Sequence, residues 1–284
     1  VTNKPVVAFL QGHGEPSLNE IPQVYQDLSV LYDVQTLMLT DTIIIPGNIK
    51  TLALVRPSDT IPDIQLAKID DFLSKGGNLL LALNRVEGNF QNASGTAVNT
   101  GLENWLLKKG ITISDNFVID ANCGAVTLQQ QQGNFTMQSQ IRFPYLPIIS
   151  KFADNPVTKG LESVSMQFAS PITFTGDTTI KYIPIAFSSE KSGSLRTPLY
   201  FDIQKQWQLS DFPMSGLVVG AILEGRFNGK SVSRIVLFSD GDFAVGGNQR
   251  GMQLPPDNIN LMVNSIDWLS DATGLIELRT KGIT

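Results

Sequence analysis

The stretch Asp70-Asp-Phe-Leu-Ser-Lys-Gly-Gly-Asn-Leu-Leu-Leu-Ala-Leu83 decides the fold class, because the end of a helix, a stop signal and a buried strand follow one another within it. Apolar residues recur at helical spacing from Pro62 to Ser74, and the Gly76-Gly77 pair is typical of a helix C-terminus. Leu79 to Leu83 is apolar at every position, as expected of a strand that is buried on both faces. This stretch therefore predicts a helix that leads into a strand at the centre of a sheet.

The same alternation extends toward both ends of the chain. Further strands are predicted at residues 5–10, 34–39, 52–55 and 117–119, and further helices at 17–32 and 102–109. Near the C-terminus, a strand at 234–238 precedes a helix with Asp257 as its N-cap and an apolar stripe that ends at Leu269. Buried strands that alternate with helices predict an α/β fold, with a mostly parallel sheet flanked by helices.

Between residues 131 and 231 the texture of the sequence changes. Short runs rich in Thr, Ser, Phe and Ile are interrupted by frequent prolines, which are incompatible with long helices. Strands are predicted at 180–188, 199–203 and 217–227. We therefore expect a discontinuous α/β domain, formed by residues 1–130 and 232–284, with a β-rich insertion or subdomain at 131–231.

Composition and charge exclude several classes of function. The chain has 284 residues, a net charge of −5, one Cys and one His, and no basic run, which argues against a nucleic acid partner or an anionic membrane surface. One Cys and one His cannot form an intrachain disulfide or a structural zinc site, and we predict no cofactor. Because no stretch reaches the ~20 apolar residues of a membrane span, we expect membrane contact only through segments outside this chain.

Two loops carry the residue types that perform chemistry. Gly12-His13-Gly14-Glu15 follows the first strand and Asp240-Gly241-Asp242 follows the last, and open α/β sheets place ligands at such carboxyl ends. The imidazole and the carboxylates could meet there as an acid/base pair or a metal site. Alternatively, the glycines only form tight turns, and the polar side chains bond to the local backbone.

The common nucleotide and nucleophile motifs are missing from the sequence. The Gly12 loop has Ser17 where a dinucleotide-binding fingerprint needs its third glycine, and the absence of a P-loop means that the chain is not itself an ATPase of that kind. Cys123 is the only thiol, and it follows a short strand rather than standing at a strand-to-helix elbow. We interpret Cys123 as a buried or incidental residue.

Four stretches together resemble the GldG-like auxiliary family of ABC transporters, which includes the gliding-motility GldG proteins of Bacteroidetes. They are Val6-Val-Ala-Phe-Leu-Gln-Gly-His-Gly-Glu15, the stretch from Asp70 to Leu83, the Phe238-Ser-Asp-Gly-Asp-Phe243 loop, and Asn258 to Leu269. The resemblance implies a periplasmic domain of an inner-membrane protein that works with an ABC permease and an ATPase. It also implies a fold similar to class I glutamine amidotransferases, with flavodoxin-like layers, and to the GIFT domain of intraflagellar transport proteins.

The same resemblance implies that the domain is not an enzyme. Active amidotransferases carry a nucleophilic Cys after the strand that corresponds to Leu79–Leu83, where this chain has Asn84 and Arg85. A His-x-Glu motif follows a late strand of those enzymes, where this chain has Asp240-Gly241-Asp242. An amide cannot be activated by a neighbouring base as a thiol can. The family has no established catalytic residues, so none is carried over.

These observations favour a non-catalytic extracytoplasmic domain of an ABC export system that engages a partner or cargo through its surface. The alternative is a ligand-binding, sugar-binding or hydrolytic α/β domain that uses His13, Glu15, Asp240 and Asp242. A purely architectural domain that braces neighbouring subunits is a third hypothesis, and the sequence does not separate it from the first.

Overall fold

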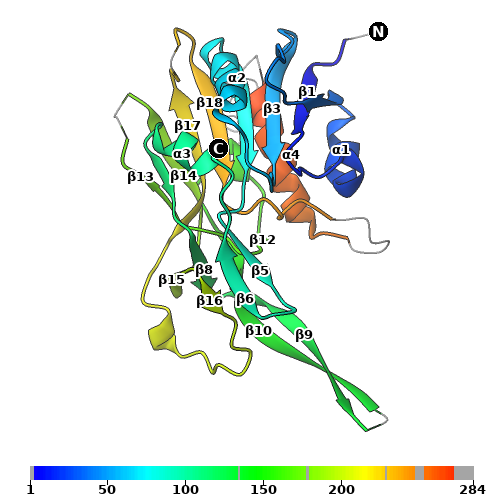
Figure 1. Cartoon of the computed structure of the whole chain (residues 1–284), viewed down its shortest axis with the longest axis vertical. Coiled ribbons are helices and arrows are strands. Elements are labelled where there is room, and N and C mark those ends of the chain that lie inside the picture. The colour runs from blue at the N-terminus through cyan, green and yellow to red at the C-terminus, as the bar shows by residue number, and fades with distance from the viewer. Residues whose placement is uncertain (1–2, 134, 177–178, 228, 247–252, 272–284) are drawn as a thin grey trace.

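The computed structural model describes residues 3–133, 135–176, 179–227, 229–246 and 253–271, so residues 272–284 at the end of the predicted α/β domain lie outside the described part. Its centre is an eight-stranded sheet with the order β11-β14-β17-β18-β4-β3-β1-β2 (Figure 1). In chain order the strands of this sheet are β1 (Val6–Gln11), β2 (Asp33–Met38), β3 (Ile49–Val55), β4 (Asn78–Ala82), β11 (Lys151–Phe152), β14 (Lys181–Phe187), β17 (Val218–Gly225) and β18 (Ser233–Phe238).

The sheet is mixed rather than mostly parallel. Strands β2, β1, β3, β4 and β18 run parallel to one another, as predicted. At the other edge, β17, β14 and β11 pair antiparallel, which the sequence analysis did not predict. These three strands come from residues 131–231, where frequent prolines leave no long helix to make a parallel crossover. The segment 131–231 thus adds three strands to the main sheet, whose other five strands come from the residues before and after it.

Helices cover both faces of the sheet. Helix α1 (Pro22–Leu28) and helix α4 (Pro256–Ser270) pack on one face, and α2 (Asp63–Ser74) and α3 (Leu102–Leu107) pack on the other. Two hydrophobic cores result, one on each face of the central strands.

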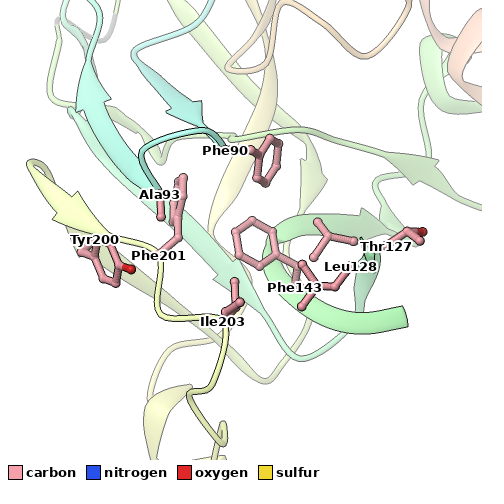
Figure 2. Close-up of a pocket in the computed structure, with 9 residues that line it drawn as sticks. Phe90, Ala93, Thr127, Leu128, Phe143, Tyr200, Phe201 and Ile203 are labelled. Carbon is pink, nitrogen blue, oxygen red and sulfur yellow. The ribbon is translucent and has the colours of Figure 1, made fainter. Parts of the chain in front are cut away.

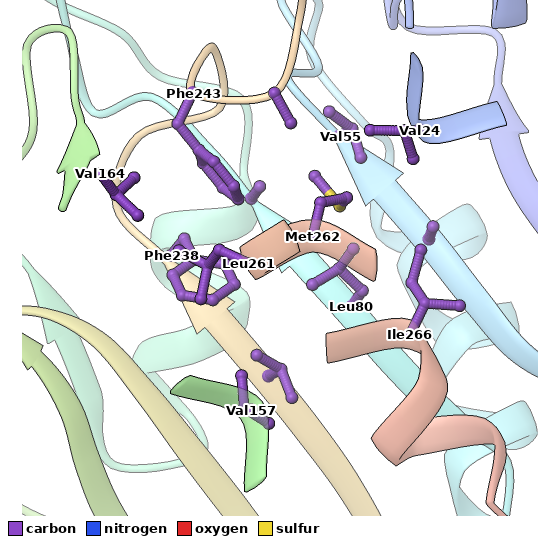
Figure 3. Packing of buried hydrophobic residues seen from close by; sticks show 14 of the residues in the cluster. Val24, Val55, Leu80, Val157, Val164, Phe238, Phe243, Leu261, Met262 and Ile266 are labelled. Carbon is purple, nitrogen blue, oxygen red and sulfur yellow. The ribbon is translucent and has the colours of Figure 1, made fainter. Parts of the chain in front are cut away.

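The strand β4 shows how one strand serves both cores. Leu80 belongs to the core under α1 and α4, whereas Leu79 and Leu81 belong to the core under α2 and α3. Figure 3 shows the first core, where Met262 and Ile266 of α4 lie beside Leu80. The uninterrupted apolar run in the sequence is thus explained by burial on both sides.

Two predicted helix details are wrong. The helix predicted at 17–32 is a short 3₁₀ turn (Leu18–Glu20) followed by α1, which restarts at Pro22 because proline lacks an N–H and suits a first helical position. The N-cap of α4 is Pro255, not Asp257. The Asp257 carboxylate instead accepts backbone N–H bonds from residues 162 and 163, so it ties α4 to a distant loop.

A second, elongated body of short sheets lies below the main sheet in Figure 1. We call it the hairpin lobe, and its strands are β5 (Val86–Asn89), β6 (Ser94–Ala97), β8 (Asn116–Asp120), β9 (Cys123–Gln132), β10 (Phe135–Ile149), β12 (Val164–Ser165), β15 (Ser192–Arg196) and β16 (Leu199–Tyr200). The strand predicted at 117–119 is β8, and it pairs antiparallel with β15 instead of joining the main sheet. Two further strands, β7 (Ile111–Ile113) and β13 (Ile172–Phe174), pair with each other against the α2 and α3 core.

Aromatic rings form the core of the hairpin lobe. Phe201 stacks on Phe168 with ring centroids 5.8 Å apart and lies edge-on to Tyr145 at 4.8 Å. Phe117 meets Phe168 edge to face at 5.6 Å. Such ring pairs stabilise a core by more than the burial of their apolar surface alone would.

In the described part of the chain, no helix is long and apolar enough to cross a membrane.

Candidate functional site

The carboxyl ends of β1, β3, β4 and β18 meet at one edge of the sheet, where open α/β sheets place ligands. The loop after β1 carries His13 and Glu15, and the loop after β18 carries Asp240 and Asp242. Strands β3 and β4 stand between β1 and β18 in the sheet. Because neighbouring strands are about 4.8 Å apart, the two predicted loops start three strand spacings, or roughly 14 Å, from each other.

The His13 loop is a tight, buried turn. The His13 carbonyl oxygen accepts the backbone N–H groups of Ser58 and Asp59, at 2.8 and 2.9 Å. Gly14 has φ +79°, and a Cβ at this position would lie 1.9 Å from Ser58 Oγ, so only glycine fits there. These contacts bind the loop after β1 to the loop after β3.

His13 and Glu15 face each other inside this turn. Glu15 Oε2 accepts the His13 backbone N–H at 2.6 Å, and His13 Nδ1 lies 3.5 Å from Glu15 Oε1. That second pair is close enough for charge attraction if the imidazole is protonated, but its geometry makes no hydrogen bond, and among the described residues neither atom has another partner. Both side chains are buried, so the pair is not presented to solvent.

The loop after β18 is closed by its own hydrogen bonds. Asp240 is fully buried, and its two carboxylate oxygens accept the backbone N–H groups of Asp242 and Gln167, each at 2.7 Å. Asn84, directly after β4, donates from Nδ2 to Asp242 Oδ2 at 2.7 Å and accepts the Gly241 N–H at 2.7 Å. Both polar ends of the Asn84 amide are therefore hydrogen-bonded within the protein.

Burial favours the protonated form of the Asp240 carboxyl group. Loss of solvent, and next the neighbouring Asp242 carboxylate, raise the pKa of Asp240 well above its ordinary value. The two backbone N–H donors act in the opposite direction, and their effect is smaller. Asp240 therefore acts as a buried structural acid, and Asp242 is the carboxylate of this loop that lines a cleft.

Arg56 joins the last loop to the third strand. It follows β3 with φ +48°, a backbone conformation that few residues other than glycine adopt. Its Nη1 lies 3.2 Å from Asp242 Oδ1, and its N–H donates to the Ala82 carbonyl at 2.8 Å. A Cβ at Gly241 would lie 2.9 Å from Arg56 Cα, so the two backbones approach closely. The sequence analysis missed Arg56, because its only local signal is an Arg-Pro pair at the end of an apolar run.

A polar cleft of about 470 Å³ opens at this edge. Its polar lining includes Arg56, Asn84, Glu87, Asn99 and Asp242, and Gly14 borders it. His13, Glu15 and Asp240 do not line it. Of the four side chains that were predicted to form a site, only Asp242 lines the cleft, and the other polar side chains of the cleft were not predicted. The side chains of His13, Glu15 and Asp240 are buried beside it.

No group of three His, Cys, Asp or Glu residues that could hold a metal ion occurs in the described part of the chain.

Cys123 lies on β9, in the hairpin lobe rather than at the sheet edge. Burial raises the pKa of its thiol, although the Arg142 guanidinium partly offsets this effect. At neutral pH the group is therefore a thiol and not the thiolate that a nucleophile requires.

An apolar hollow of about 380 Å³ opens on the surface of the hairpin lobe. Figure 2 shows its wall, where Phe90, Phe143 and Phe201 turn their rings toward one another near Ile203. None of its lining residues is charged, and Phe90 and Tyr200 are 54% and 70% exposed. Exposed apolar surface of this kind is typical of contact sites for other proteins.

The family of the chain follows from its sequence over almost its full length. A family model described as an ABC-type uncharacterized transport system matches residues 4–269. The chain belongs to this family. This membership agrees with the predicted role as an auxiliary component of ABC transport.

Individual relatives are more distant. An uncharacterized protein from Borreliella burgdorferi is 27% identical over 139 residues, which is 46% of this chain and 26% of that protein. The chain therefore spans about a quarter of the length of the curated relative that it matches.

Solved structures add a likeness of fold. The mmIFT52 N-terminal domain is 12% identical, has a TM-score of 0.59, and is matched over 94% of this chain and 98% of its own length. A glutamine amidotransferase from Thermotoga maritima is 11% identical, with a TM-score of 0.39, over 98% of this chain and 86% of its own. At 12% identity, the likeness to the mmIFT52 N-terminal domain concerns the fold alone.

Proposed function

We propose that this chain is a non-catalytic, extracytoplasmic module of an auxiliary subunit in an ABC export system, and that it acts by contacting the permease and ATPase assembly. Membership of an ABC transport family supports the link to a transporter. Gliding motility, which the sequence resemblance associates with some members, is not needed by this proposal.

The proposal that the chain is not an enzyme is supported by the polar side chains at the sheet edge, which are hydrogen-bonded to one another and to the backbone. Asn84 is hydrogen-bonded to Asp242 and Gly241, and the Asp240 carboxylate accepts two backbone N–H groups. A general base or nucleophile needs a side chain that is free to reach a substrate. Here those side chains hold the loops together instead.

The hairpin lobe supplies a surface suited to a protein partner. Its apolar hollow combines buried rings with exposed ones, and its lining carries no charge. We propose that an uncharged, apolar segment of the permease occupies this hollow, since a charged segment would lose its hydration there without gaining an ion pair.

Co-purification tests this proposal. The full-length protein, expressed together with its permease and ATPase, should copurify with both. Tyr200→Asp and Ile203→Asp, at the hollow, should reduce the recovered permease at least several-fold. Leu209→Asp is the matched control, because Leu209 is also an exposed apolar residue of this region but does not line the hollow.

Two results would contradict the proposal. The first is an unsubstituted protein that recovers neither subunit and whose deletion leaves the transporter assembled. The second is an equal loss of permease in the Tyr200→Asp variant and in the Leu209→Asp control, which would remove the hollow from the interface.

A second candidate function rests on the polar cleft. Its combination of Arg56, Glu87 and Asp242 is suited to a small neutral ligand with several hydroxyl groups, such as a sugar. Thermal shift measurements with a panel of monosaccharides test this alternative. A shift that disappears in Glu87→Gln and Asp242→Asn would favour it, whereas no shift with any sugar would exclude this class of ligand.

A further inference from the structure

Strand β2 is the edge strand of the main sheet beside β1, and we propose that it pairs antiparallel with β2 of a second copy of this chain. The opposite edge strand, β11, has two residues and carries Lys151, which are common protections against further pairing. β2 has six residues without Lys, Arg or Pro, and its register with β1 has no bulge. Among the described residues, no strand pairs with the outer side of β2, so a further strand can add there.

The backbone directions of β2 determine which residues are available for pairing. Asp33 N–H donates to the Pro5 carbonyl at 2.9 Å, and Leu39 N–H donates to the Gln11 carbonyl at 2.8 Å. Because backbone groups alternate in direction along a strand, the odd-numbered residues face β1. The N–H and C=O groups of Val34, Thr36 and Met38 therefore point out of the sheet.

Two-fold symmetry then leaves one register that places all three outward residues in hydrogen-bonded pairs. Outward residues must pair with outward residues, so Thr36 lies opposite Thr36 of the second copy on the two-fold axis, and Val34 lies opposite Met38. A shift of the centre to Gln35 would pair Met38 with Tyr32, which lies before β2 and is buried.

The side chains suit this register. Val34, Thr36 and Met38 share one face of the strand, and Val34 already packs against the core under α1 and α4. Met38 is 56% exposed, so its pairing with Val34 of the second copy would cover an apolar side chain that now meets water. On the other face Gln35 lies opposite Leu37, and no pair places like charges opposite each other.

The ends of β2 are complementary as well. Val30 and Leu31, at 69% and 60% exposure, precede its amino end, and Ile44, at 84%, follows its carboxyl end. Lys4, which donates to the Ser29 carbonyl at 2.6 Å, lies at the amino end, and Asp41 lies beyond the carboxyl end. Antiparallel pairing brings the amino end of each copy to the carboxyl end of the other, so the exposed apolar residues of the two copies come together there. Lys4 of one copy then lies at the same end as Asp41 of the other, whose Oδ1 also accepts Gln65 Nε2 at 2.7 Å.

Disulfide trapping tests the register. In a Cys123→Ser background, Thr36→Cys should form a covalent dimer under mild oxidation, since hydrogen-bonded antiparallel partners have Cα atoms about 5.5 Å apart, within disulfide range. Gln35→Cys is the matched control, because it lies opposite Leu37 rather than opposite itself. We expect at least a tenfold faster cross-link for Thr36→Cys. A faster cross-link for Gln35→Cys would overturn the register.

Proline substitution tests the dimer itself by sedimentation. The parent chain should sediment at twice its mass of 31.0 kDa at high concentration. Thr36→Pro should be monomeric yet folded, because the N–H that it removes points outward. Gln35→Pro should instead lower the stability of the monomer, since that N–H faces β1.

A parent chain that stays monomeric up to millimolar concentration, or a Thr36→Pro variant that stays dimeric, would overturn the proposal. These outcomes are independent of the transporter proposal, because β2 lies in the main sheet and the hollow lies in the hairpin lobe.

Discussion

Asp240 Oδ1 accepts the backbone N–H of Asp242 at 2.7 Å. Although this bond joins residues that are only two positions apart, their carboxylates lie in opposite environments. Asp240 is fully buried, whereas the Asp242 side chain lines the polar cleft and contacts Arg56. One loop thus separates a structural acid from a solvent-facing one, and the two should respond differently to substitution.

The raised pKa of Asp240 predicts a pH dependence of stability. The folded protein holds this proton more tightly than the unfolded chain, so its contribution to the free energy of unfolding is present at low pH. That contribution decreases as pH rises from the ordinary value of 3.8 through the raised pKa. Asp240→Asn should remove this decrease, as measured by urea unfolding at a series of pH values.

Asp257 provides the control for this experiment, with the opposite sign. Backbone N–H groups of Ser163 and Glu162 lower its pKa. Its contribution is therefore present above the ordinary pKa and is lost as pH falls through the lowered value, so Asp257→Asn should flatten the acid side of the profile instead. Identical profiles for the two variants would contradict both assignments.

Asn84→Ala should destabilise the fold by about 1–3 kcal/mol, because it removes two hydrogen bonds and leaves the Gly241 N–H without its acceptor. The free energy of unfolding from urea titration measures this effect. Asn48→Ala, at an exposed position, is the control and should change stability by less than about 0.5 kcal/mol. Equal stability of the two variants would show that the Asn84 bridge contributes nothing.

Gly14 and Gly160 have nearly the same backbone conformation, with φ +79° and +78°, but different surroundings. A Cβ at Gly14 would collide with Ser58 Oγ, whereas a Cβ at Gly160 would have no atom within 4 Å. Gly160→Ala should therefore lower the stability by about 1–2 kcal/mol through conformation alone. Gly14→Ala should lower it by a further ~1–3 kcal/mol through crowding. Thermal unfolding of both variants measures the difference.

Phe201 and Tyr200 are neighbours in the chain with opposite burial. Phe201 is in the aromatic core of the hairpin lobe, and Phe201→Ala should destabilise the protein by about 3–5 kcal/mol. Tyr200→Ala should change stability by less than about 0.5 kcal/mol, because its ring is exposed. Urea unfolding followed by tryptophan fluorescence suits this comparison, since Trp207 packs against Tyr145 in the same core. Similar losses in both variants would contradict the opposite roles assigned to the two rings.

The central strands were predictable because their signal is local. The run Leu79 to Leu83 is apolar at every position, and β4 is indeed buried on both faces. The hairpin of β5 and β6 was missed, because its signal is not local. A Cβ at Gly88 would meet Phe168 at 2.4 Å, and a Cβ at Gly95 would meet Phe117 at 2.6 Å, so these glycines are explained by rings that are distant in the sequence.

The candidate site was predictable only in part, for two physical reasons. The sequence indicates which residues follow each strand but not the order of the strands, and that order places β3 and β4 between His13 and Asp240. The position of the Arg56 side chain depends on its positive φ. An arginine in the sequence does not indicate this backbone conformation, whereas a glycine would have suggested it. Asn84 was found only as the replacement of a nucleophile, and its two hydrogen bonds appear in the structure alone.

The pairing of β4 with β18 has a consequence for how the protein is made. Arg234 N–H donates to Asn78 Oδ1 at 2.9 Å across 156 residues of chain. At roughly 5–20 residues per second, a ribosome needs about 8 to 31 seconds to progress from the first of these partners to the second. Throughout that interval β4 can pair with β3, which precedes it in the chain, but the edge that later receives β18 has no partner.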